Sequence, residues 1–318
     1  QTCALPILAE LSIEDGFGVW FERYHKHMQV NGYTEQTLTQ KRETIRYFVA
    51  WCEERGLEKP YQVTEEVVNR YKHHLHYAPS QTGEPLSVST QRLRLTSVKV
   101  FFRYLMEQRF IEVNPCKTLQ LPRVKHKVCR DFLALEEVET VLLEPDLSKP
   151  TGIRDRAMME LFFSSGLRRN ELTHIGVFDV NMVDRKLNIV EGKGGKQRVI
   201  PMTSRACMWL EHYMDGVRPQ LDKKLTDRLF LGRYGQPLSN GTVTRSFGQY
   251  IKRALPNKKG ACHILRHSFA TSMLEGDINL RALQELLGHS SLSTTQIYMK
   301  TTNKFIEKEF TKAHPFSE

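Results

Sequence analysis

The feature that most constrains the fold is a helical spacing of apolar residues that recurs along the first third of the chain. Between residues 13 and 111, four segments place apolar side chains three or four positions apart, as on one face of an α-helix. The four apolar faces consist of Phe17, Trp20, Phe21, Tyr24 and Met28; Leu38, Ile45, Phe48, Val49 and Cys52; Val68, Tyr71 and Leu75; and Leu95, Val98, Phe102 and Leu105. Because each helix must bury its apolar face, this spacing predicts a four-helix domain with its own core.

Local signals mark where these helices begin and end. The second segment starts near Thr34, Thr64 stands at a position typical of an N-cap, and Gly56 follows the second segment as a helix-ending glycine. The pair Asn114-Pro115 ends the helical region, because a residue before proline disfavours helical backbone angles. We therefore expect a helical domain at 13–112 and a basic linker at 113–130. Residues 1–12 read like nothing downstream and are a possible tag or processing scar.

The remaining sequence predicts a second domain at 131–300 that is mainly helical with one small sheet. Helices are expected near 135–143, 155–164, 204–213, 242–254, 263–275 and 280–287. Residues 187–190 and 197–202 are β-branched and apolar, and the glycine-rich stretch 191–196 separates them, which predicts a β-hairpin. A distinct tail follows at 301–318. The whole chain is thus expected to be mainly α and multidomain.

The charge of the chain is compatible with a polyanionic partner and, equally, with a basic protein that is merely soluble. The formal net charge is +10 and the isoelectric point is about 9.3, and summed positive charge attracts and holds phosphates. The fourth predicted helix carries Arg92, Arg94, Lys99 and Arg103 away from its apolar face. A face that enters a DNA groove and an ordinary solvated face are both compatible with that row of cations.

Several classes of protein are excluded. No apolar run is long enough to cross a membrane, and no basic-then-apolar secretory signal opens the chain. The six cysteines are scattered without a CxxC pair, which indicates free thiols in a reducing cytoplasm rather than a disulfide framework or zinc site. The cluster His73, His74 and His76 has no nearby cysteine or spaced carboxylate. We therefore expect no metal site there.

Three short motifs stand apart from this background. Residues 165–172 read Ser-Gly-Leu-Arg-Arg-Asn-Glu-Leu, and residues 263–271 read His-Ile-Leu-Arg-His-Ser-Phe-Ala-Thr. Residues 286–298 read Leu-Leu-Gly-His-Ser-Ser-Leu-Ser-Thr-Thr-Gln-Ile-Tyr. Taken singly, each polar residue in these motifs has an ordinary structural explanation. Their order and spacing together are hard to assign to packing.

The spacing of the motifs favours a site for an anion. His263 and Arg266 are three positions apart and share a face near a helix N-terminus, where backbone N–H groups also attract anions. Gly288 ends the preceding helix and places His289 in a turn. Ser293 and Gln296 form a capping-box pattern, so Tyr298 lies in the first turns of a new helix, where its side chain can project into a site.

As a set, these motifs resemble the signature of the tyrosine recombinase family of the phage integrase type. The resemblance extends over most of the chain, from about 13 to 310, and is nearest to Xer-like and transposon- or integron-type members. It implies an N-terminal SAM-like core-binding domain followed by a mixed α/β catalytic domain. The function it implies is site-specific DNA cleavage and rejoining through a 3′-phosphotyrosine intermediate, as in DNA integration by mobile elements.

The resemblance also implies a role for individual residues. Tyr298 is the nucleophile, Arg168 and Arg266 are the catalytic arginines, and His263 and His289 are the catalytic histidines. Lys193 in the hairpin turn matches the catalytic lysine, and Lys196 is the alternative for that role as well as a candidate DNA contact. Glu171 matches a supporting position that orients Arg168. No metal or other cofactor is required, because the phosphotyrosine conserves the bond energy; correspondingly, the sequence has no Walker loop and no carboxylate pair at two-metal spacing.

The expected partner is double-stranded DNA with a specific recombination site, bound by both domains as a clamp, with Arg92, Arg94 and Lys99 in the major groove. By the same resemblance, the enzyme acts as a homo-tetramer on DNA. Its tail docks on a neighbouring copy through Phe305, Ile306 and Phe310, or else packs on its own domain. Two alternatives stay open: a type IB topoisomerase, which shares the chemistry, and a catalytically silent DNA-binding regulator.

Overall fold

The computed structural model describes residues 16–80, 83–124, 132–190, 197–223 and 225–288. Its contacts divide the chain into two compact units, residues 1–126 and 127–318, which are treated separately below. Several residues singled out in the sequence lie outside the described ranges. They are Lys193, Lys196, His289, Tyr298 with its capping pair Ser293 and Gln296, and the tail at 301–318.

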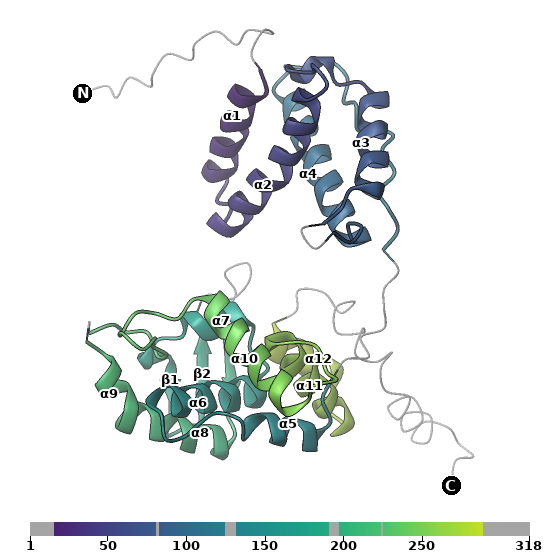
Figure 1. Cartoon of the computed structure of the whole chain (residues 1–318). Coiled ribbons are helices and arrows are strands. Elements are labelled where there is room, and N and C mark those ends of the chain that lie inside the picture. Colours follow the sequence, from purple (N-terminus) through teal and green to yellow (C-terminus); the bar gives the residue numbers. More distant parts are fainter. Residues whose placement is uncertain (1–15, 81–82, 125–131, 191–196, 224, 289–318) are drawn as a thin grey trace, which may run out of the picture. The chain divides into compact units, whose positions relative to one another are not determined.

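The first unit contains the four predicted helices (Figure 1). They are α1 (Phe17–Val30), α2 (Glu35–Glu53), α3 (Glu65–Tyr77) and α4 (Val88–Glu107), with a short 3₁₀ turn η1 (Pro60–Gln62) between α2 and α3. Phe48 lies at the centre of the core and makes edge-on ring contacts with Phe17, Tyr71 and Phe102. The unit therefore has a core of its own, formed by the faces that the periodicity predicted.

The expected helix ends are confirmed. The hydroxyl groups of Thr34 and Thr64 each accept a hydrogen bond from the backbone N–H three residues later, which satisfies a donor that the helix leaves open. Gly56 has a φ of +72°, a left-handed conformation that suits glycine after a helix. Ser87, which the sequence argument did not single out, caps α4 in the same way.

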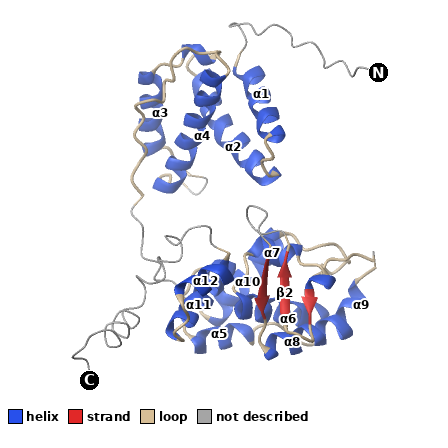
Figure 2. Ribbon diagram, turned by 180° about the vertical axis from the view of Figure 1, so that it is seen from behind, coloured by secondary structure: helices blue, strands red, loops and turns tan. Residues whose placement is uncertain are grey.

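The second unit is mainly helical with one small sheet, as predicted, and that sheet has three strands (Figure 2). Its helices are α5 (Leu135–Leu142), α6 (Pro150–Ser165), α7 (Arg169–His174), α8 (Ser204–Glu211), α9 (Arg218–Leu221), α10 (Asn240–Ala254), α11 (Cys262–Glu275) and α12 (Leu280–Leu287). A 3₁₀ turn η2 (Val177–Asp179) follows α7, and a π-helical turn η3 (His212–Val217) joins α8 to α9.

Helix α6 begins five residues earlier than predicted, at Pro150 instead of 155. Its first turns carry charged side chains that are nevertheless buried, because Arg154 pairs with Asp155 and Arg156 pairs with Glu160 at 2.7–2.8 Å. Apolar periodicity could not reveal a helix that is buried on nearly every side through paired charges.

The predicted hairpin is confirmed as β2 (Lys186–Ile189) and β3 (Arg198–Pro201), which pair antiparallel with Leu187 opposite Ile200. A two-residue strand β1 (Val180–Asn181), not predicted from the sequence, pairs with the other edge of β2. Leu187, Ile189 and Ile200 are buried in the same core as α6. The last residues of β2 and the first of β3 thus flank the glycine-rich stretch that contains Lys193.

Among the helices that the structure describes, none is long and apolar enough to span a membrane.

Candidate functional site

The first motif places Arg168 at the start of α7. Arg168 is the N-cap residue, and its backbone N–H donates to the Glu171 carboxylate at 2.8 Å. The Arg168 guanidinium reaches the same carboxylate, with Nη1 donating to Glu171 Oε1 at 2.8 Å. The side chain of Glu171 is only 2% exposed, whereas that of Arg168 is 24% exposed. A buried carboxylate therefore holds a guanidinium group that is still accessible. The Glu171 carboxylate thus holds the Arg168 side chain in place, and its supporting role in catalysis stays a prediction.

Gly166, two residues earlier, determines how the chain reaches Arg168. It ends α6 in a left-handed conformation with a φ of +58°, and a Cβ at this position would lie 2.3 Å from a ring carbon of Phe269 on α11. Because no L-side chain fits there, glycine allows α6 and α11 to approach closely. This approach brings the first motif beside the second.

The second motif supplies Arg266 from the first turns of α11. The Arg266 side chain is buried; Nη1 donates to the carbonyl of Gly166, and Nη2 donates to the carbonyl of Leu287 at 2.7 Å. One turn earlier, His263 is exposed at the N-terminal end of α11. Partial removal from water and the positive charges of Arg169 and Arg266 lower the pKa of His263 below its usual value. The imidazole is therefore neutral at pH 7 and able to accept a proton.

Arg198 on β3 also contacts Glu171, and the sequence argument missed this arginine. Its Nη1 and Nη2 donate to the two carboxylate oxygens of Glu171, each at 2.8 Å, and its Nε donates to the carbonyl of Leu286 at 3.0 Å. Arg198 is two positions from the buried Ile200, so both side chains lie on the inward face of the strand. A cation at an inward-facing position of a predicted strand was the sequence signal that could have identified Arg198.

Three arginines thus converge on the end of α12. Arg198, Arg266 and Arg168 donate in turn to the carbonyls of Leu286, Leu287 and Gly288. These arginines come from β3, α11 and the start of α7, which are far apart in sequence. The result is a concentration of guanidinium groups, which stay ionised and create a positive region that attracts a phosphate.

Gly288 makes this convergence possible. It has a φ of +62° and ends α12, as predicted. A Cβ at this position would lie 2.8 Å from Nη1 of Arg198 and 3.0 Å from Nη1 of Arg168. Glycine is therefore required both for the backbone angle and for the space that the guanidinium groups occupy.

Glu171 is ionised in this environment. Burial on its own raises the pKa of this carboxyl, but hydrogen bonds from Arg198 and from the backbone of Arg168, together with the Arg198 charge, lower it below its usual value. The negative charge therefore persists at neutral pH and holds the two guanidinium groups in place.

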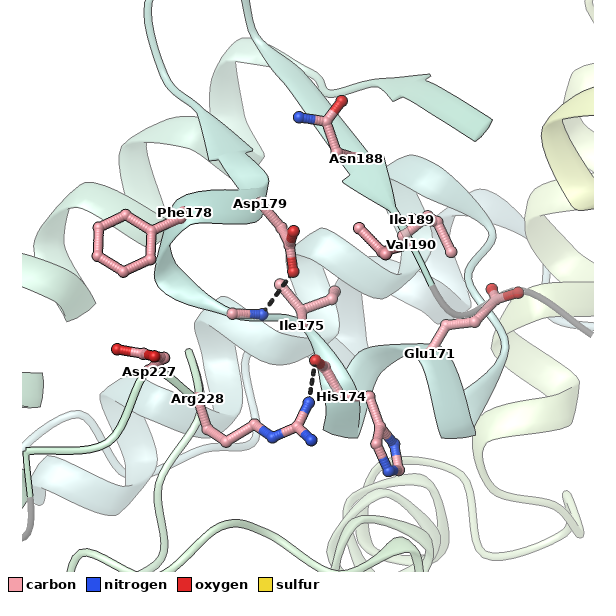
Figure 3. Close-up of a pocket in the computed structure, with 11 residues that line it drawn as sticks. Glu171, His174, Ile175, Phe178, Asp179, Asn188, Ile189, Val190, Asp227 and Arg228 are labelled. Atoms are coloured by element: carbon pink, nitrogen blue, oxygen red, sulfur yellow. Dashed lines mark hydrogen bonds between the residues drawn. The ribbon is translucent and has the colours of Figure 1, made fainter. Parts of the chain in front are cut away.

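A cleft beside α7, lined in part by Glu171, is a weaker candidate for a site. It lies between the end of α7, η2 and β2, and Figure 3 shows Asp179, Asp227 and Arg228 around it. Two of its polar side chains already have partners in the protein. Arg228 donates to the carbonyl of His174, and Asp179 accepts from the N–H of Gly176 at 2.8 Å. These contacts hold loops together.

The candidate DNA contacts on α4 belong to the first unit, whereas the arginine cluster, Arg168, Arg198 and Arg266, belongs to the second. Arg92 is exposed and donates to the carbonyl of Pro122 at 3.0 Å, and the Arg94 guanidinium lies 3.8 Å from the ring centre of Tyr47. Lys99 is partly exposed. Whether these cations contact DNA stays a prediction.

Of the residues predicted to be catalytic, the structure brings together Arg168 and Arg266, with His263 one turn from Arg266 and Glu171 between two arginines. Lys193, His289 and Tyr298, together with Lys196, lie outside the described residues. Within the described part of the chain, no group of three histidine, cysteine, aspartate or glutamate side chains is arranged to hold a metal ion.

Comparison with known families gives two matches that together span most of the chain. Residues 131–304 match the phage integrase family, and residues 20–112 match the phage integrase N-terminal SAM-like domain.

Individual relatives agree with these matches. The chain is 38% identical to the tyrosine recombinase XerC 2 of Ralstonia nicotianae over 93% of this chain and 85% of that protein. It is 32% identical to the tyrosine recombinase XerD of Staphylococcus epidermidis, over 92% of this chain and 98% of the relative.

Solved structures show the same fold at lower identity. The Tn1549 transposon integrase in complex with transposon right end DNA has a TM-score of 0.72 at 19% identity, covering 92% of this chain and 99% of that one. The XerH site-specific recombinase bound to a palindromic difH substrate has a TM-score of 0.69 at 20% identity, covering 92% of this chain and 83% of that one.

Proposed function

The chain belongs to the phage integrase family and is a tyrosine-type site-specific DNA recombinase, and from that premise we propose how its residues carry out strand cleavage and rejoining. Tyr298 is the nucleophile, Arg168 and Arg266 hold the scissile phosphate, His263 and His289 assist, and Lys193 is the general acid. The observation that carries this proposal is the convergence of Arg168 and Arg266 on consecutive carbonyls at the end of α12.

In the cleavage step, the phenolic oxygen of Tyr298 forms a bond to phosphorus, and the bond from phosphorus to the 5′ oxygen breaks. His263 accepts the phenolic proton, because its lowered pKa leaves the imidazole ring neutral at pH 7. Lys193 donates a proton to the departing 5′ oxygen, which would otherwise be a poor leaving group. Rejoining is the reverse reaction with the 5′ hydroxyl of another strand, so the phosphodiester bond energy is conserved.

The arginines act on the charge that develops on the non-bridging oxygens. Guanidinium groups that are already fixed by Glu171 and by backbone carbonyls need little reorganisation when this charge develops. Removal of one such donor typically lowers the rate by about 10²–10³-fold. Lys196 is the alternative general acid, since it lies in the same stretch between β2 and β3 as Lys193.

We propose double-stranded DNA with a specific recombination site as the substrate. The Tn1549 integrase and XerH structures are complexes with DNA, and a lambda integrase structure is a tetramer bound to a Holliday junction. By analogy, this chain acts as a homo-tetramer in which the tail at 301–318 docks on a neighbouring copy. The +10 net charge supplies affinity for phosphates.

We propose that the chain has three functional parts, namely a core-binding domain at 13–112, a basic linker at 113–130 and a catalytic domain at 131–300. Arg92, Arg94 and Lys99 are the proposed groove contacts of the first domain. The cytoplasm is the proposed compartment, where free thiols persist. Four cysteines among the described residues are buried free thiols, namely Cys52, Cys116, Cys207 and Cys262.

A nicked suicide duplex tests the chemical proposal. DNA recovered from cells by crosslinking supplies the binding sequence, from which the nicked duplex is made. We expect the wild-type chain to form a covalent adduct at the 3′ phosphate and Tyr298→Phe to form none. Arg168→Ala should bind the same duplex and cleave it about 10²–10³-fold more slowly. Normal cleavage by either variant would contradict the assigned role of that residue.

A further inference from the structure

We propose that Arg198 is a positioning residue for strand cleavage, which joins the arginine that holds the phosphate to the end of the helix that precedes Tyr298. This inference rests on the proposed function. Arg198 is distinct from the six proposed catalytic residues, since its role is exerted through Glu171 and through the backbone of α12.

The first half of the argument is the shared carboxylate. Arg198 binds Glu171 with both Nη atoms at 2.8 Å, so the planar guanidinium and the planar carboxylate lie fork to fork. Arg168 binds the same carboxylate through Nη1 and through its backbone N–H. Glu171 is therefore a rigid bridge, and the orientation of Arg168 depends on the position in which Arg198 holds that bridge.

The second half is the contact with α12. Arg198 Nε donates to the carbonyl of Leu286 at 3.0 Å, in the last turn of the helix. Arg168 and Arg266 donate to the next two carbonyls, those of Gly288 and Leu287. Arg198 thus binds both the support of Arg168 and the helix end to which Arg168 itself is bonded.

The environment of Arg198 favours a positioning role over direct contact with DNA. Its side chain is 13% exposed, against 24% for Arg168, and Nε, Nη1 and Nη2 all donate to protein acceptors. Lysine at this position would keep the positive charge and lose the fork that contacts Glu171 and Leu286 together. Arg198→Lys therefore tests the geometry while the charge is retained.

The matched control is Arg205→Lys in the same unit. Arg205 on α8 also donates to both oxygens of a buried carboxylate, with Nε 2.8–2.9 Å from Glu160, and its Nη1 reaches Glu139. This network includes none of the residues of the arginine cluster. Arg205→Lys should therefore lose arginine hydrogen bonds to a buried carboxylate and keep the cleavage rate.

The experiment measures single-turnover cleavage of the nicked duplex at saturating protein, together with the affinity for the uncleaved duplex. We expect Arg198→Lys to lower the rate constant by about 10–100-fold, because small displacements of a catalytic group have effects of this size. The affinity should change less than about threefold, and the final fraction of protein in the adduct should equal that of the wild type. A loss of folded protein would instead lower that fraction and leave the rate constant unchanged, which would contradict the inference.

A double variant tests the route through Glu171. If Arg198 and Glu171 act as one unit, Arg198→Lys combined with Glu171→Gln should cleave at most about threefold more slowly than the slower single variant, because effects within a unit are not additive. Multiplied effects of the two substitutions would overturn the inference. A wild-type rate for Arg198→Lys would overturn it as well.

Amide hydrogen exchange provides a readout without catalysis. Arg198→Lys should speed exchange in residues 283–288 relative to the wild type, and Arg205→Lys should leave that segment unchanged. Unchanged exchange in Arg198→Lys would refute the contact with α12. Absence of a wild-type adduct would contradict the proposed function instead, and the exchange result would still decide whether Arg198 orders the helix end.

Discussion

Glycine at position 288 illustrates how a residue without a side chain can determine the geometry of charged neighbours. The backbone is left-handed there, and the nearest atoms to an added Cβ would belong to Arg198 and Arg168. Gly56 shares the left-handed conformation, with a φ of +72°, but an added Cβ would meet no atom within 4 Å. The two positions therefore separate backbone strain from displacement of the arginines.

We expect Gly288→Ala and Gly56→Ala to lower the free energy of unfolding by about 1–2 kcal/mol each from backbone strain. Only Gly288→Ala should also lower the cleavage rate, by about tenfold or more, since the new methyl group displaces two guanidinium groups. Urea unfolding and single-turnover cleavage measure the two effects. Equal cleavage rates for the two variants would show that the space at Gly288 is not critical for the arginines.

Helix α4 is the element with the clearest division between a packing face and a cationic face. Leu95, Val98 and Phe102 are completely buried, whereas Arg92 is exposed and its partner is a backbone carbonyl. A carbonyl does not neutralise a guanidinium. Arg92 therefore keeps its charge available to a phosphate.

If Arg92 contacts a DNA phosphate, Arg92→Ala should weaken binding similarly for all sequences and reduce the slope of log affinity against log salt by about one. The control is Arg70→Ala on α3, where the exposed arginine pairs with Glu66 at 2.6 Å. That variant should leave the slope unchanged. Affinity measured across a salt series gives both slopes, and an unchanged slope for Arg92→Ala would remove Arg92 from the interface.

The elements that the sequence predicts well are those specified by local signals. Thr34, Thr64 and Gly56 mark helix ends through contacts within a few residues, so the four helices of the first unit could be found from periodicity and caps. The start of α6 was wrong because its charges are buried in pairs. The short elements α7 and β1 carry too few residues for a periodic signal.

The site shows the same limit. Arg168, His263 and Arg266 stand in recognisable motifs, so their grouping could be proposed from the sequence. Arg198 has no motif of its own, and its importance depends on contacts with Glu171 and α12 that exist only in the folded chain. Residues that act through such distant contacts require the structure.

At the scale of the whole molecule, the chain consists of two units with separate cores. Leu95 and Phe48 are completely buried in the core of the first unit, and Leu210 and Phe247 are completely buried in the core of the second. Two separate cores imply that a cavity in one unit leaves the packing of the other intact.

We expect Leu95→Ala to destabilise the first unit by about 2–5 kcal/mol, because the substitution leaves a cavity in a fully packed core. Leu210→Ala should have a similar effect on the second unit. Calorimetric unfolding should resolve two components, and each variant should shift a different one. A common shift of both components in either variant would show that the units unfold as one.

The meeting of three guanidinium groups at the end of α12 links stability to substrate. Arg168 and Arg198 share the single carboxylate of Glu171, and Arg266 donates to the same helix end. Like charges held close together store repulsion that a bound phosphodiester relieves. A ligand that binds only the native state at 100 times its Kd adds about 2.7 kcal/mol to the free energy of unfolding. We therefore expect DNA, the proposed substrate, to stabilise the second unit against unfolding, and we expect departure of the DNA to restore the repulsion among the arginines.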